Sequence, residues 1–162
     1  MNKRGIMPHI HEKIDFTVEV FIVYKNKVLL RIHDKYKIWL SVGGHIELDE
    51  DPNQAALREV IEEVGLKVEL YKDPNLNLIS NNERYSELIP PIFMSRMNIT
   101  DTHEHVVLTY FAKSNTDKLI ISKSEKTEGC RWFTMEELDN PKYRIKDTIK
   151  NYAKRALETL KY

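Results

Sequence analysis

The feature that most constrains the fold is a short segment that carries both the start and the stop signal of a helix. Asp51 can act as the N-cap, Pro52 suits the first helical position, and Gln54 completes a capping-box pattern with Asp51. Gly65 stands where a glycine commonly ends a helix. The residues between these signals include apolar side chains at helical spacing, namely Ala55, Ala56, Val60 and Val64. The sequence therefore predicts one amphipathic helix over 52–64.

Strand-like runs surround this helix on both sides. They are rich in β-branched and aromatic residues and are separated by polar turns. The predicted strands cover 15–24, 28–33, 38–42, 66–70, 88–97, 105–112 and 130–134, and 119–122 is a further short apolar run. A short helix is predicted over 135–138 and a terminal amphipathic helix over 143–160. Many strands with one central and one terminal helix predict a mixed α/β domain in α/β/α layers.

The length of 162 residues suits one domain over 1–162, in which 1–13 form a mobile or edge-packed start. The 25 basic and 25 acidic residues give a formal net charge of zero, which does not favour a nucleic-acid partner. Cys130 is the only cysteine, so an internal disulfide is excluded. The sequence shows no signal-peptide pattern and no apolar run of ~20 residues, so we expect a cytoplasmic protein without a membrane span.

Three glutamates in the predicted helix indicate where the chemistry lies. Glu59, Glu62 and Glu63 are spaced i, i+3 and i+4, which places their carboxylates on one face. Most acidic runs are solvated surface, but this helix contains no lysine, and Arg58 is its only cation. A hard divalent cation would offset the repulsion, because magnesium and manganese prefer oxygen ligands. The pair Gly43-Gly44 just upstream permits a ligand to approach the backbone closely.

These residues resemble the signature of the Nudix hydrolase family. That signature is a glycine, a glutamate six residues later, and then an Arg-Glu, Glu-Glu and Gly pattern on a helix. Its fixed positions are filled here by Gly44, Glu50, Arg58, Glu59, Val60, Glu62, Glu63, Gly65 and Leu66. The resemblance implies the family's α/β/α sandwich with a mixed sheet.

The resemblance also implies an activity. A Nudix hydrolase (MutT-like) cleaves the diphosphate linkage of a nucleoside diphosphate derivative, a small nucleotide-type substrate, and uses Mg²⁺, for which Mn²⁺ can substitute. By resemblance, Glu59, Glu62, Glu63 and the carbonyl of Gly44 would bind the metal, with Glu62 as ligand or base and Arg58 as a further catalytic residue. Homodimers are common in the family, so a homodimer is a further expectation.

Many family members use one more acid outside the signature. Glu125 is our first choice for this base, because it lies in the loop before the strand with Trp132. Glu104 is the second choice and Glu128 the third, and a plain surface role is an equal alternative for all three.

Two other functions stay open. A Nudix-like domain can bind nucleotides without turnover, although that loss usually damages the glutamates, which are complete here. An isopentenyl-diphosphate-isomerase-like activity would need a cysteine upstream of the glutamates, whereas Cys130 lies downstream.

Three histidines are candidate ligands. His45 follows the glycines and can touch phosphate or remain a solvated loop residue. His103 and His105 share one face of a strand, but the sequence offers no third ligand near them and so does not favour a zinc site.

Overall fold

The computed structural model describes residues 13–33, 36–78, 84–121 and 127–161, without the side chains of Thr127 and Glu128. In chain order the elements are β1 (Ile14–Tyr24), β2 (Lys27–His33), β3 (Trp39–Leu40), β4 (Val42–His45), α1 (Pro52–Val64), β5 (Val68–Leu70), β6 (Phe93–Thr100), β7 (His103–Ser114), β8 (Thr127–Phe133), two 3-10 turns (Glu137–Asp139 and Pro141–Tyr143) and α2 (Asp147–Thr159).

Strand β1 lies at the centre of the sheet. It runs parallel to β7 along one edge and antiparallel to both β4 and β2 along the other. The remaining pairs are antiparallel: β7 with β5 and β6, and β2 with β3 and β8. One parallel pair among antiparallel pairs makes the sheet mixed, as predicted.

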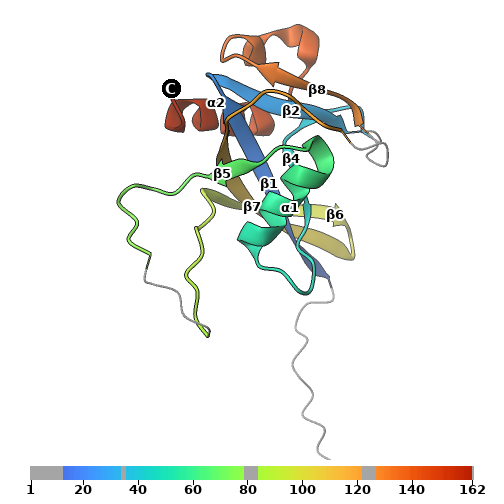
Figure 1. The fold of residues 1–162 in the computed structure, drawn as a ribbon. Helices are drawn as coiled ribbons and strands as arrows, with labels where there is room; N and C mark the ends of the chain where they lie inside the picture. The colour runs from blue at the N-terminus through green and yellow to red at the C-terminus, as the bar shows by residue number, and fades with distance from the viewer. Residues whose placement is uncertain (1–12, 34–35, 79–83, 122–126, 162) are drawn as a thin grey trace, which may run out of the picture.

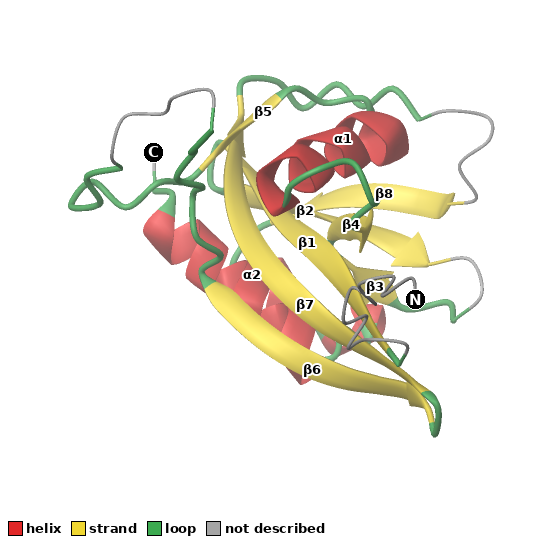
Figure 2. Ribbon diagram, turned by 90° about the horizontal axis from the view of Figure 1, so that it is seen from below, coloured by secondary structure: helices red, strands yellow, loops and turns green. Residues whose placement is uncertain are grey.

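The two helices cover opposite faces of this sheet (Figures 1 and 2). Side chains alternate along β1, so that Val18, Val20 and Ile22 pack in the core under α1. Phe21 and Val23 pack in the second core, under α2. Burial of each large side chain stabilises the fold by about 1.5–3 kcal/mol. The predicted α/β/α sandwich is confirmed.

Helix α1 has the predicted bounds and caps. The Asp51 carboxylate accepts hydrogen bonds from the backbone N–H groups of Asn53 and Gln54, and the Gln54 side chain accepts one from the N–H of Asp51. Gly65 ends the helix with φ of 67°, and its N–H donates to the carbonyl of Ile61. Local side-chain chemistry therefore determines both ends of the helix that carries the glutamates.

The predicted bounds of the strand over 38–42 are wrong. The structure has two short strands, β3 and β4, in this region, and Gly43 and Gly44 lie inside β4 rather than after a strand. The reason is tertiary, because β4 pairs with β1 through Gly43↔Glu19 and Gly44↔Val18. Gly43 has φ of 155°, and a Cβ there would lie 2.9 Å from the Cα of Glu19, so only glycine fits this pairing.

Several other boundaries also differ from the predictions, and two of them have a local cause. Strand β6 begins at Phe93, because Pro90 and Pro91 lack the N–H groups that a strand pairing needs. The terminal helix begins at Asp147, since Arg144 adopts a left-handed conformation with φ of 51° after the second 3-10 turn. Segment 1–12 lies outside the described residues.

Every helix in the described part of the chain is too short or too polar to cross a lipid bilayer.

Candidate functional site

Helix α1 presents its charged residues toward strand β4. Val60 and Val64 are fully buried in the core, which fixes the rotation of the helix about its axis. Glu59 and Glu63, one turn apart, are consequently directed at the paired glycines of β4.

Arg58 joins most of the carboxylates of the site. Its Nε and Nη2 donate to the two oxygens of Glu50 at 2.9 and 2.6 Å. Its Nη1 donates to Glu59 at 2.8 Å and to Glu62 at 2.9 Å, and Nη2 also reaches the carbonyl of His45 at 2.9 Å. The hydrogen bond from Arg58 lowers the pKa of the Glu50 carboxyl, and the acceptors, with Glu50 first, raise the pKa of Arg58. Both groups therefore remain charged at neutral pH.

Glu63 is the buried carboxylate of the set. The backbone N–H of Gly43 donates to its Oε2 at 3.0 Å, and Arg31 of β2 forms an ion pair with its Oε1. Arg31 was not among the site residues predicted from the sequence. Its signal is a lone arginine inside the apolar run of β2, where a strand side chain needs a buried acceptor.

Gly44 lies against the carboxylate of Glu59. A Cβ at Gly44 would stand 2.6 Å from the Cδ of Glu59, which is closer than any real contact. Absence of a side chain at this position therefore makes room for the Glu59 carboxylate beside the backbone of β4. This is a second, independent reason for the glycine pair.

Clustered carboxylates give this site the chemistry of a cation site. Four carboxylates, from Glu50, Glu59, Glu62 and Glu63, lie together with the guanidinium groups of Arg58 and Arg31. Carboxylate oxygens are the ligands that a hard divalent cation such as magnesium or manganese prefers. Glu59 and Glu62 share Arg58, whereas Glu63 turns to Gly43 and Arg31, so the arginines hold the oxygens that a metal would need.

A cleft of ≈ 350 Å³ opens beside this site. Its lining includes Gly43 and Gly44 together with polar side chains of four strands, Thr17, Glu19, Arg31, His45 and His105, and of Ser41 between β3 and β4. The cleft therefore joins the backbone next to the glutamates to a polar surface large enough for part of a small molecule.

The carboxylate of Glu19 accepts two hydrogen bonds in this cleft. The hydroxyls of Thr109 and Ser41 donate to its two oxygens at 2.6 and 3.0 Å. Burial nevertheless raises the pKa of Glu19, because desolvation of the charged form outweighs the two hydrogen bonds.

This raised pKa predicts how stability depends on pH. Below the ordinary pKa the carboxyl is neutral in both states, whereas above the raised pKa the folded protein holds a charge that the unfolded chain would solvate. The contribution of Glu19 to stability is therefore lost as pH rises through the folded pKa. We expect Tm of Glu19→Gln, relative to the original chain, to rise by a few °C between about pH 4 and about pH 8. Thermal unfolding across this range measures it, with exposed Glu69→Gln as the control. A difference in Tm that does not change with pH would contradict the assignment.

A known domain family accounts for this arrangement. The model of the NUDIX domain matches residues 15–155 of the chain, which include β1, the glutamate helix and most of α2. The chain belongs to the NUDIX domain family. The predicted membership of the Nudix family is thereby confirmed.

Solved NUDIX structures share the fold. The crystal structure of a hydrolase of the NUDIX family from Clostridium perfringens is 34% identical, with a TM-score of 0.80 over 91% of this chain and 98% of that chain. An Ap4A hydrolase of C. elegans is 20% identical, with a TM-score of 0.57 over 89% of this chain and 93% of that chain, and supports the fold alone.

A curated NUDIX relative is the m7GpppN-mRNA hydrolase NUDT17 of Danio rerio, 28% identical over 131 residues. The match covers 74% of this chain and 41% of that protein, so the chain corresponds to less than half of the relative's length. The names of these relatives agree with the predicted enzyme class, a hydrolase of the NUDIX family.

The NUDIX acid outside the signature stays a prediction. Glu125 lies outside the described residues, and so does the side chain of Glu128. Glu104 is paired with Lys13 at 2.8 Å and with Arg96 at 3.6 Å. Cys130 packs against the core under α1.

Proposed function

We propose that the chain hydrolyses the diphosphate linkage of a nucleoside diphosphate derivative, with Mg²⁺ as the metal and Mn²⁺ as a substitute. The observation that carries the proposal is the carboxylate cluster on α1, placed against Gly44 and beside a polar cleft. Membership of the NUDIX family and the hydrolase names of its relatives support it.

Each residue of the set has a proposed role. Glu59, Glu62 and Glu63, with the carbonyl of Gly44, would hold the metal, which supplies positive charge that offsets the charge of the diphosphate. Glu62 is the most exposed of the three, with 53% of its side chain accessible, so it can also receive a proton. Arg58 positions these carboxylates. The base outside the signature is proposed to be Glu125.

Arg31 is the proposed contact to the substrate. It lines the cleft, and its Nε is buried without a hydrogen-bond partner among the described residues. A buried donor without an acceptor is costly, and a phosphate oxygen in the cleft would satisfy it. Arg31 would thus bind substrate with Nε while its ion pair keeps Glu63 in place.

The substrate is a small nucleotide-type molecule in this proposal. The formal net charge of zero does not favour extended contacts to a nucleic-acid backbone. The named relatives act on different nucleotide compounds, so the residues of the cleft, rather than the glutamate helix, would select among substrates.

Turnover of a substrate panel tests the proposal. Nucleoside triphosphates, nucleotide sugars and dinucleoside polyphosphates are incubated with Mg²⁺, with Mn²⁺ or with a chelator, and the products are separated by chromatography. We expect metal-dependent formation of a nucleoside monophosphate or another product of diphosphate cleavage. Binding of nucleotides without turnover in any metal would instead support the alternative of a catalytically inactive sensor domain.

A further inference from the structure

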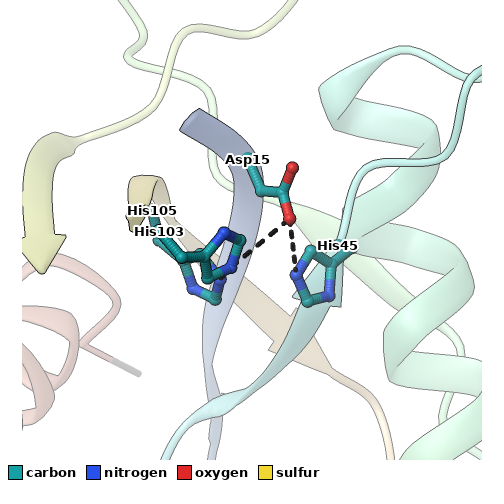
Figure 3. A group of neighbouring side chains, drawn as sticks. All are labelled: Asp15, His45, His103 and His105. Atoms are coloured by element: carbon teal, nitrogen blue, oxygen red, sulfur yellow. Dashed lines mark hydrogen bonds and ion pairs between the residues drawn. The ribbon is translucent and has the colours of Figure 1, made fainter. Parts of the chain in front are cut away.

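A second group of side chains with metal-ligand chemistry lies away from the glutamates. In the part of the chain that the structure describes, Asp15, His45, His103 and His105 form a group whose potential ligand atoms all lie within 4.8 Å of one another. Figure 3 shows Asp15 between His45 on one side and His103 with His105 on the other. This arrangement supplies the third and fourth ligands that the sequence spacing of His103 and His105 did not indicate.

The sheet register explains why these residues meet. Asp15 of β1 is directly opposite His105 of β7, and His103 precedes His105 by two residues on the same face. His45 of β4 is opposite Thr17, which shares its face of β1 with Asp15. Because β1 lies between β4 and β7, three strands deliver four side chains to one point.

The distances between the ligand atoms suit a small tetrahedral ion. Bonds of about 2.0–2.1 Å place the ligands of a tetrahedral zinc ion about 3.3–3.4 Å apart. The Oδ2 of Asp15 lies 3.6 Å from Nε2 of His45 and 3.5 Å from Nε2 of His103. The Nε2 atoms of His103 and His105 are 3.0 Å apart. Shifts of a few tenths of an ångström would bring these three separations to the tetrahedral value, and the remaining pairs of ligand atoms lie within 4.8 Å of one another.

The donor set separates this group from the glutamates. Three imidazoles and one carboxylate favour a borderline transition-metal ion, whereas carboxylates alone favour magnesium or manganese. The two groups also lie on different faces of β4, because Gly44 faces Glu59 and its neighbour His45 points to the opposite side.

An ion can reach this group from solvent. The side chains of Asp15 and His45 are 50% and 58% exposed, and His103 is 35% exposed. His45 and His105 also line the cleft, so a bound ion would place positive charge at its wall.

The geometry points to a second metal site, formed by Asp15, His45, His103 and His105, that binds one Zn²⁺-class ion independently of the glutamate site. A bound ion would connect β1, β4 and β7 where these strands meet.

Metal retention tests this inference. Chelator-treated, tag-free protein is dialysed against Zn²⁺ in excess Mg²⁺, and the zinc content per chain is measured. We expect one zinc per chain, and a rise in Tm of about 5 °C or more at a hundredfold excess over Kd. With Co²⁺ as the probe, a tetrahedral site gives visible absorption bands from the bound ion.

Matched variants locate the ion. His103→Ala and Asp15→Asn should weaken zinc binding by at least ~100-fold. This exceeds the ~10–100-fold loss expected for a residue that contacts a metal ligand but not the metal itself. His33→Asn, which removes a cleft histidine outside the group, and Glu59→Gln should retain the zinc. Circular dichroism without metal checks that each variant is folded.

The zinc content of the original chain and of these variants shows whether the ion is bound by the histidine group or by the glutamates. Absence of zinc from the original chain, or its retention in folded His103→Ala, would overturn the inference. Loss of zinc in Glu59→Gln would place the ion at the glutamates and also overturn it. None of these results depends on turnover, so the proposed hydrolysis can fail or succeed separately.

Discussion

Replacement of Glu63 by glutamine should lower kcat/KM by at least ~100-fold, the scale of loss for a metal-binding or proton-transfer group. Glutamine keeps the size of the side chain and an oxygen that can accept the N–H of Gly43. It removes the negative charge that a divalent ion needs and that Arg31 pairs with. The expected loss is therefore one of chemistry, with the fold retained.

The measurement is kcat/KM on the best substrate of the panel, over a range of Mg²⁺ concentrations. Glu69→Gln serves as the matched control, because Glu69 is an exposed glutamate on β5. Circular dichroism and thermal unfolding show whether each variant is folded. A folded Glu63→Gln with the rate of the original chain would refute the assignment of Glu63 as a ligand.

Replacement of Arg58 by lysine should cost about 10–100-fold in activity and raise the Mg²⁺ concentration needed for half-maximal rate. Arg58 donates to Glu50, Glu59 and Glu62 and to the carbonyl of His45 at the same time. A lysine carries one compact charge and cannot span these acceptors in the planar geometry of a guanidinium group. Without Arg58 the carboxylates would lose their common orientation.

The Mg²⁺ dependence separates positioning from simple stabilisation. If Arg58 only stabilised the fold, the lysine variant would lose Tm but keep the original Mg²⁺ requirement. Arg96→Lys is the control, because Arg96 is largely exposed and its ion pair with Glu104 is loose. An unchanged Mg²⁺ requirement in folded Arg58→Lys would count against the positioning role.

Local signals in the sequence were sufficient to predict the bounds of the glutamate helix. Asp51, Gln54 and Gly65 act within a few residues, so the bounds of α1 could be read from neighbours along the chain. The contact of Arg58 with Glu62 follows from helical spacing alone, because the two residues are four apart. The family signature depends on the same local pattern, and the match to the NUDIX domain model confirms the predicted family.

Contacts between distant strands could not be read in this way. The position of the glycines inside β4, the ion pair of Arg31 with Glu63 and the hydroxyl contacts of Glu19 all depend on which strands pair and in what register. The period of a strand says which residues share a face but not which strand lies opposite.

The sequence by itself therefore determined the helix, its caps, its carboxylates and the layered fold class, because each of these depends on short-range periodicity or on a contiguous motif. Only the tertiary structure decided that β1 lies between β4 and β7, and so that Asp15, His45, His103 and His105 meet. The physical reason is that strand pairing joins residues far apart in the chain. The backbone hydrogen bonds between paired strands are the same for every sequence, so they do not indicate which strand is the partner.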